Sequence, residues 1–166
     1  MSVKRSVFGL LGLLLAVVLA AFAAAPANAA TVQAHVSSNG NHVLIFPPAP
    51  PGARSAAVHP NVVAPTSSPA VTTVHGAPGS SYTCNSGDLC AVVWDPTTSS
   101  YEAFVFYVCQ RYHLANWFGD GNYFDNQSSS AHTYFYGSGG NVLTSFYPQR
   151  TNIAYDWDPV YSIRNC

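Results

Sequence analysis

Aromatic residues are concentrated in one part of this chain. Of the 22 Phe, Trp and Tyr residues in its 166, 19 lie in residues 81–166. Each aromatic side chain buries about 150 to 250 Å² when it is packed in a core. Together such side chains supply much of the free energy that folds a small domain. We therefore expect residues 81–166 to form the folded domain.

Apolar residues of this region come in short runs between turn residues, which is typical of β-strands. Runs of β-branched and aromatic residues cover residues 91–94 and 103–108. Two further runs, 133–136 and 141–144, flank the Gly-rich residues 137–140 and predict a hairpin with a four-residue loop. No window of eleven residues keeps apolar residues at helical spacing. The sequence predicts an all-β sandwich or small barrel.

Residues 30–80 have a different composition. Residues 31–80 hold eight of the 12 prolines, no acidic residue and one aromatic, Phe46. With so little to bury, such a segment cannot offset an ordering cost of about 1 to 2 kcal/mol per residue. We predict a disordered linker or pro-region over residues 30–80, in which residues 43–46 add at most an edge strand. A Pro-rich ligand for another protein is less favoured, because no PxxP register repeats.

The first 29 residues resemble a secretory leader. Lys4 and Arg5 precede an apolar run over residues 7–25, and small residues follow before Ala30. We predict a signal peptide, residues 1–29, cleaved after Ala29, and a secreted, extracellular protein. A membrane anchor is the alternative, but Pro26 and the small-residue exit favour cleavage, and no later stretch has 18 apolar residues.

Charge limits the partners of the mature chain. Without the leader it has four arginines, no lysine and seven acidic residues, a net charge of −3. Binding to nucleic acid or to an anionic membrane surface needs clustered cations. We expect neither partner, and we expect a monomer.

Four cysteines in an exported chain predict two disulfides. Of the three possible pairings we prefer Cys84 with Cys90, and Cys109 with Cys166, because a bond from the last residue ties down an end that would otherwise fray. A zinc site is less well supported, since the sequence has no CxxC pair and His113 is the one histidine near Cys109.

Several segments carry a resemblance to a known family. They are CNSGDLCAVVWD (84–95), CQRY (109–112), DNQSSS (125–130) and PVYSIRNC (159–166). Residues 81–166 resemble the small secreted βγ-crystallin-like proteins grouped with the Streptomyces metalloproteinase inhibitor. The resemblance implies a Greek-key sandwich, with Tyr112, Trp117 and Gly119 at the spacing of an aromatic corner and its glycine. Residues 99–102 depart from the family, because they lack the aromatic followed by Gly-Gly of a first crystallin hairpin.

The resemblance extends to a calcium pattern at residues 125–130. A crystallin loop of this pattern implies calcium ligands from the Gln127 backbone carbonyl and the Ser129 hydroxyl. The partner loop departs from the pattern at Trp157 and Tyr161. We favour the alternative that these short polar side chains hydrogen-bond the turn backbone.

The family resemblance implies inhibition of an extracellular peptidase of the metalloproteinase type. An inhibitor needs a rigid exposed loop that loses little entropy on binding. The loop between Cys84 and Cys90 is one candidate, and residues 119–126 are the other. The family's reactive bond joins a disulfide-bonded cysteine to a following valine. It has no counterpart here, so no reactive-site residue is transferred.

A glycan-binding or cell-wall-binding module, or an antifungal toxin-like role, is the alternative function. Trp117 and Tyr123 would stack on sugar rings, with Asn116, Asn122 and Asn126 nearby in sequence. Against this, a domain of this size needs most of its aromatics in the core.

Catalysis is less favoured. Asp156, Asp158 and Glu102 could supply a carboxylate pair for glycoside chemistry, but isolated acids are usually solvated. His113 and His132 have no motif linking them to a nucleophile. We predict a protein that is not an enzyme and has no cofactor apart from the calcium considered above.

Overall fold

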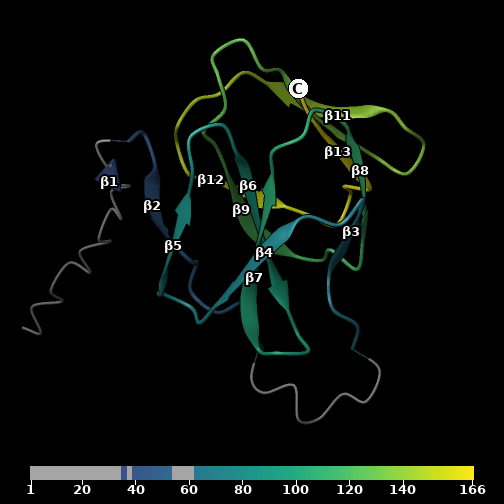
Figure 1. The fold of residues 1–166 in the computed structure, drawn as a ribbon. Coiled ribbons are helices and arrows are strands. Elements are labelled where there is room, and N and C mark those ends of the chain that lie inside the picture. Colours follow the sequence, from purple (N-terminus) through teal and green to yellow (C-terminus); the bar gives the residue numbers. More distant parts are fainter. Residues whose placement is uncertain (1–34, 37–38, 54–61) are drawn as a thin grey trace, which may run out of the picture. The chain divides into compact units, whose positions relative to one another are not determined.

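The computed structural model describes residues 35–36, 39–53 and 62–166, and all regular structure in these ranges is β (Figure 1). A membrane-spanning helix is not found within them. The predicted signal peptide, residues 1–29, lies outside the described residues.

Antiparallel strands form two five-stranded sheets and a three-stranded sheet. The central sheet has the order β12 (Ile153–Asp156), β9 (Asp120–Asp125), β6 (Leu89–Asp95), β7 (Ser100–Phe106) and β4 (Thr72–Gly76). The outer sheet has the order β11 (Val142–Phe146), β10 (Thr133–Tyr136), β13 (Ser162–Asn165), β8 (Arg111–Ala115) and β3 (Thr66–Ser68). The small sheet has the order β1 (His35–Val36), β2 (His42–Ile45) and β5 (Ser81–Cys84).

Strand β6 lies at the centre of the fold and is buried on both faces. Leu89, Ala91 and Val93 face the main core between the central and outer sheets. The alternate residues Cys90 and Val92 face a second core against the small sheet. Because successive side chains of a strand point to opposite faces, the central sheet is covered on both sides.

Aromatic side chains dominate the main core. It contains Phe104, Phe106, Tyr112, Trp117, Tyr123, Phe135, Phe146 and Trp157, with Leu114, Val160 and Ile163. The second core contains Leu44, Phe46, Tyr82, Tyr101, Ala103 and Phe124. The high aromatic content of residues 81–166 thus serves packing between sheets.

A disordered linker over residues 30–80 was predicted, and this is wrong for three segments. Strand β4 pairs with β7 over five residues, from Thr72 opposite Val105 to Gly76 opposite Tyr101. Strand β3 pairs with β8, and β2 pairs with both β1 and β5, so that β2 is the middle strand of the small sheet and not an edge. The folded unit therefore begins upstream of residue 81.

Strands β3 and β4 were not predicted because of their position in the sheets. Both β3 and β4 are edge strands whose side chains are exposed or half-buried. An edge strand needs backbone hydrogen bonds and few apolar side chains, so its Ser and Thr residues carry little signal in the sequence. The apolar run at 43–46 contributes Leu44 and Phe46 to the second core.

The all-β class, the hairpin and both disulfides are confirmed. Strands β10 and β11 pair antiparallel, and across their loop the Gly137 amide donates to the Asn141 carbonyl at 2.9 Å. Disulfides join Cys84 to Cys90 and Cys109 to Cys166.

Candidate functional site

The connection between β7 and β8, residues 107–110, exposes two large apolar side chains. Tyr107 is 71% exposed and Val108 is 57% exposed. The backbone around them is fixed: the Tyr112 hydroxyl donates to the Val108 carbonyl at 2.8 Å, and Cys109 is bonded to Cys166. The Gln110 amide also donates to Asn165 Oδ1 at 3.4 Å. We call residues 107–110 the pinned loop.

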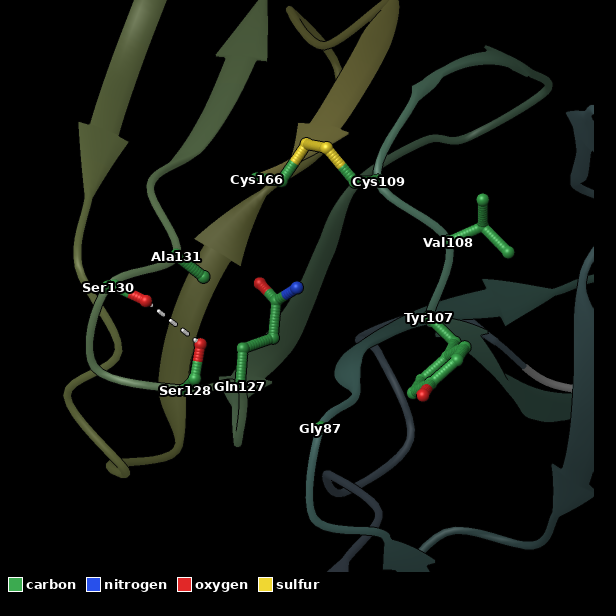
Figure 2. A pocket seen from close by; sticks show the side chains of 9 residues that line it. All are labelled: Gly87, Tyr107, Val108, Cys109, Gln127, Ser128, Ser130, Ala131 and Cys166. Carbon is green, nitrogen blue, oxygen red and sulfur yellow. Dashed lines mark hydrogen bonds between the residues drawn. A yellow bond between two sulfur atoms is a disulfide. The ribbon is translucent and has the colours of Figure 1, made fainter.

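A surface cleft of about 620 Å³ adjoins the pinned loop (Figure 2). Its lining residues are Gly87, Tyr107, Val108, Cys109, Gln127, Ser128, Ser130, Ala131 and Cys166. Figure 2 shows Tyr107 and Val108 on one side of the cleft and Ser128 and Ser130 on the other. Both disulfide-bonded segments thus contribute to one end of the sandwich.

Gly87 lets the Tyr107 ring lie close to the turn between Cys84 and Cys90. Gly87 has a φ of +98°, and a Cβ built there would lie 3.3 Å from the Tyr107 ring. The Gly87 amide donates to the Asn126 carbonyl at 2.9 Å, and the Asn126 amide donates to the Asp88 carbonyl at 2.9 Å. The turn that was predicted as one inhibitory loop therefore supports the pinned loop from the side.

Beneath the cleft lies a buried polar network. The Gln127 amide donates to Asp125 Oδ1 at 3.1 Å, and the Gln127 side-chain amide donates to the Asn165 carbonyl. Thr133 Oγ1 lies 3.0 Å from Asp125 Oδ2 and 3.2 Å from Gln127 Oε1, and its one proton serves one of them at a time. Burial raises the pKa of Asp125, while the bonds from Gln127 and Thr133 lower it in part. This network ties the 125–133 segment to the C-terminal strand.

Residues of the predicted calcium loop are mostly engaged with the protein itself. Asn126 Nδ2 donates to the carbonyls of Gly40 at 2.9 Å and Cys84 at 3.2 Å, and Gln127 is 6% exposed. Ser129 is exposed. The side chains of Asp125, Asn126 and Gln127 thus have structural partners, and calcium binding through the Gln127 carbonyl and Ser129 stays a prediction.

The predicted sugar-stacking residues lie in the core. Trp117 is 3% exposed and packs edge-on against Trp157 with ring centroids 5.0 Å apart, while Tyr123 is 5% exposed and stacks on Phe146 at 4.7 Å. The Trp117 indole donates to the Thr66 carbonyl at 3.0 Å. The prediction that Trp117 and Tyr123 bind a glycan is therefore wrong, because neither ring has a free face. Of the nearby asparagines, Asn122 and Asn126 are buried as well.

The prediction that residues 119–126 form an inhibitory loop is also wrong. Residues 120–125 form β9, which pairs with β6 on one side and β12 on the other. A strand inside a sheet cannot extend into a peptidase cleft.

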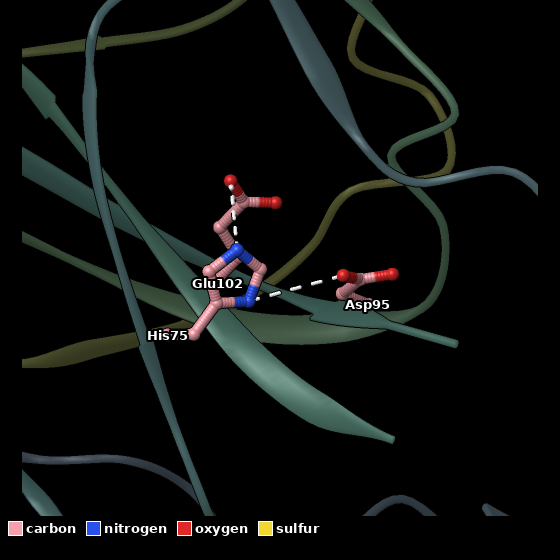
Figure 3. Close-up of side chains that lie close together, drawn as sticks. All are labelled: His75, Asp95 and Glu102. Atoms are coloured by element: carbon pink, nitrogen blue, oxygen red, sulfur yellow. Dashed lines mark ion pairs between the residues drawn. The ribbon is translucent and has the colours of Figure 1, made fainter. Parts of the chain in front are cut away.

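Sequence reasoning missed a cluster of His75, Asp95 and Glu102 (Figure 3). His75 Nε2 lies 3.5 Å from Glu102 Oε1, and His75 Nδ1 lies 3.8 Å from Asp95 Oδ2. The residues come from β4, β6 and β7, and His75 pairs directly with Glu102 across the sheet. Because the three residues come from separate strands, no local sequence motif predicts that they lie together. Within the described ranges it is the one group of such side chains close enough to hold a metal ion.

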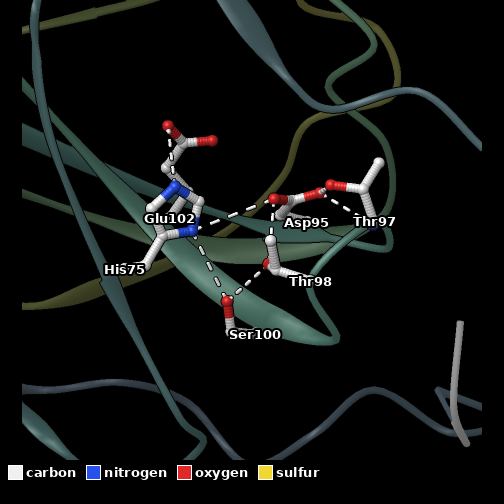
Figure 4. A network of polar contacts seen from close by, with 6 residues as sticks. All are labelled: His75, Asp95, Thr97, Thr98, Ser100 and Glu102. Atoms are coloured by element: carbon white, nitrogen blue, oxygen red, sulfur yellow. Dashed lines mark hydrogen bonds and ion pairs between the residues drawn. The ribbon is translucent and has the colours of Figure 1, made fainter.

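Most bonds of this cluster belong to the turn between β6 and β7 (Figure 4). Asp95 Oδ1 accepts from the Thr97 amide at 2.8 Å and its hydroxyl at 2.7 Å, and Asp95 Oδ2 accepts from Thr98 Oγ1 at 2.9 Å. Burial raises the pKa of Glu102, with the Thr73 hydroxyl and His75 acting in the opposite direction. Three donors of the turn already bond the Asp95 carboxylate, so a cation at this cluster would compete with them.

The carboxylates considered for glycoside chemistry are not brought together. Glu102 on β7 and Asp156 on β12 are separated by β6 and β9. At about 4.8 Å per strand this places them roughly 14 Å apart, beyond the separation of roughly 5 to 9.5 Å that glycosidases use. Asp158 accepts a bond from the Gly119 amide at 2.7 Å and so links the β12–β13 connection to the β8–β9 connection.

Comparison with protein-family models, with curated protein sequences and with solved structures gave no significant match. Disulfides form and persist in oxidising compartments, which suggests an extracellular protein.

Proposed function

We propose that this chain is an exported binding protein that inhibits a peptidase, and that the pinned loop enters the peptidase cleft. The observation that supports this most is the exposure of Tyr107 and Val108 on a backbone fixed by a disulfide and by the Tyr112 hydroxyl. We propose no catalytic role for the chain. The leader would direct export and be cleaved after Ala29.

Rigidity of the loop is the physical basis of the proposal. Only four residues separate β7 from β8, and Val108, Cys109 and Gln110 each have a fixed contact outside the loop. Ordering a mobile side chain on binding costs about 0.5 to 1.5 kcal/mol, and a loop already held in place avoids much of the further cost of ordering its backbone. A loop of this kind can occupy a cleft tightly without adding a large interface.

The side chains of the pinned loop limit which peptidases it can inhibit. Residues 107–110 carry no charged side chain, so they do not suit a peptidase whose specificity pocket selects a cation or an anion. The adjacent Tyr107 and Val108 suit an apolar pocket. Together with the family resemblance, this favours a secreted metalloproteinase with apolar specificity as the target.

The finer fold is part of the same proposal. We propose that the two five-stranded sheets are an elaborated βγ-crystallin-type sandwich. In support, Tyr112 binds backbone four residues upstream and Gly119 has a φ of +69°, as expected for an aromatic corner with its glycine.

The test is a panel of secreted metallo-, serine and cysteine peptidases, each titrated with purified residues 30–166. This range is used because β2, β3 and β4 belong to the folded unit. Stoichiometric loss of activity in one class supports the proposal. Full activity of every enzyme at micromolar protein would overturn it.

A further inference from the structure

The solvent face of the outer sheet carries a ladder of aromatic rings and two arginines. Tyr134 of β10, Arg164 of β13 and Arg111 of β8 are neighbours in one row across three paired strands. Tyr136, Ser162 and His113 form the next row on the same face, in which His113 is exposed and Tyr136 and Ser162 are covered by their neighbours. Phe135 and Ile163, which alternate with these residues, point into the main core.

Both arginines lie over tyrosine rings. The Arg111 guanidinium carbon is 3.7 Å from the centre of the Tyr136 ring, and that of Arg164 is 5.9 Å from the centre of the Tyr134 ring. Tyr136 lies opposite Ser162 of the intervening strand β13, and this small side chain leaves room for the Arg111 guanidinium to reach across. Stacking on a ring fixes a guanidinium plane while leaving its N–H edge free to bind an anion.

The ring ladder continues to the end of the sheet. Tyr134 and Tyr136 are stacked at 6.1 Å, the His132 ring lies 4.4 Å from Tyr134, and Tyr147 stacks on His132 at 4.3 Å with 15° between the planes. The Tyr134 hydroxyl and His132 Nδ1 are 2.8 Å apart. Tyr147 is 57% exposed, so the ladder ends in a ring with an open face.

Charge on this face has one sign. The four strands β8, β10, β11 and β13 contain no acidic residue. Arg111 and Arg164 are exposed, and neither forms an ion pair within the described part of the chain. In a mature chain of net charge −3, two of its four arginines therefore stand together without a carboxylate partner.

A groove opens beside the ladder. It has a volume of about 430 Å³ and is lined in part by Arg111, His113, Tyr161 and the Gly-rich turn of residues 137–140. Tyr161 is 53% exposed. The groove adds the imidazole of His113 and another open aromatic ring to the same face.

We propose that this face binds an acidic polysaccharide that carries a carboxylate on its sugar units. Open rings of Tyr147 and Tyr161 suit the apolar faces of sugars, and the hydroxyl and imidazole groups suit sugar hydroxyls. Arg164 and Arg111 lie on adjacent strands, and their guanidinium groups are held over two rings whose centres are 6.1 Å apart, so both can contact one acidic chain. The planar guanidinium of each arginine can donate two parallel hydrogen bonds to the two oxygens of a carboxylate. This site is separate from the pinned loop and does not depend on peptidase inhibition.

Single-stranded nucleic acid is the other polymer that combines stacking with negative charge. Its binding depends on several phosphate contacts and a positive groove. Two arginines on a negatively charged protein do not provide these, whereas hydroxyl-rich sugars use the polar groups between the rings.

The experiment is affinity electrophoresis of residues 30–166 in native gels that contain polygalacturonate, dextran or no polymer. We expect retardation by polygalacturonate alone, with an apparent dissociation constant that rises when salt is added. Arg111→Gln with Arg164→Gln should weaken this binding at least tenfold and Arg164→Gln alone should weaken it measurably, whereas Arg150→Gln, which matches the single variant in lost charge, should change it less than twofold. Thermal melting of each variant identifies any that fail to fold, in which case Arg164→Gln alone and Tyr147→Ala replace the double variant.

Three results would overturn the proposal: no retardation of the wild type, equal retardation by dextran, or retention of binding in the folded double variant. A separate gel that contains oligo(dT) supplies a fourth: tighter binding of oligo(dT) than of polygalacturonate would overturn the proposal and assign the face to nucleic acid.

Discussion

The hydroxyl of Tyr112 donates a hydrogen bond to the backbone carbonyl of Val108, with 2.8 Å between the oxygens. Tyr112 is 2% exposed and belongs to the main core, whereas Val108 is exposed. The bond thus holds the backbone of the pinned loop against a side chain that is fixed in the core. Replacing the hydroxyl tests this link without changing the packing of the ring.

Tyr112→Phe should leave the fold intact and loosen the pinned loop. Removing one hydrogen bond costs about 1 kcal/mol, and the freed carbonyl can bind water because the loop is exposed. We expect faster hydrogen exchange at residues 107–110 and weaker inhibition. Tyr147→Phe, whose hydroxyl has no hydrogen bond within the described residues, is the control and should change neither. Unaltered exchange in Tyr112→Phe would show that the disulfide and the Gln110 bond hold the loop without the tyrosine hydroxyl.

Gly87→Ala should destabilise the protein more than Gly79→Ala. Both glycines have positive φ, +98° and +78°, so each substitution adds backbone strain of about 1 to 2 kcal/mol. Only at Gly87 would the new Cβ also meet the Tyr107 ring, at 3.3 Å, whereas nothing lies within 4 Å at Gly79. Urea unfolding measures both costs. Equal costs would mean that Tyr107 moves away freely and that the ring is not supported by the turn.

Glu102→Gln should reduce the loss of stability between pH 4 and pH 7. Burial raises the pKa of Glu102 in the folded protein above its value in the unfolded chain. The stability that Glu102 contributes is therefore fully present below its unfolded pKa, about 4.3, and is lost as the pH rises through the folded pKa. Urea unfolding at pH 4.0, 5.5 and 7.0 compares the variant with the wild type. Asp120→Asn, which removes an exposed carboxylate on β9, is the control; an identical pH profile for Glu102→Gln and the wild type contradicts the prediction.

Removing residues 30–80 should damage the remaining domain. The truncated chain loses β4 from the edge of β7 and also the hydrogen bonds from Trp117 to Thr66 and from Tyr101 to Pro48. We expect a thermal midpoint more than about 10 °C lower than that of residues 30–166, equivalent to about 2 kcal/mol for a domain of this size. Circular dichroism follows the transition. An equal thermal midpoint would mean that residues 30–80 do not stabilise the domain and act as a linker.

Local patterns made several features predictable from the sequence. The hairpin of β10 and β11 follows from two strand-like runs around a Gly-rich turn. The disulfides could be assigned because Cys84 and Cys90 are close in the chain, and with four cysteines that bond leaves Cys109 to pair with Cys166. In each case the deciding interaction lies within a short segment.

Features that depend on distant strands were not predictable. The Ser- and Thr-rich β3 and β4 are held by backbone hydrogen bonds to β8 and β7, which leave no mark in their own composition. Trp117 and Tyr123 carry the same sequence signal whether they face a ligand or a core, and only the sheet packing decides. The Arg111 and Tyr136 pair likewise requires the order of β8, β13 and β10.

The most direct test of the central claim compares three proteins in titrations of the peptidase that the panel identifies. They are the wild type, Tyr107→Ala with Val108→Ala, and Phe118→Ala, which removes an apolar side chain that is 67% exposed outside the loop. We predict one-to-one inhibition by the wild type and by Phe118→Ala, and an inhibition constant at least 100-fold higher for the loop variant, about 2.7 kcal/mol of binding free energy. Inhibition by the loop variant equal to that of the wild type would contradict the account.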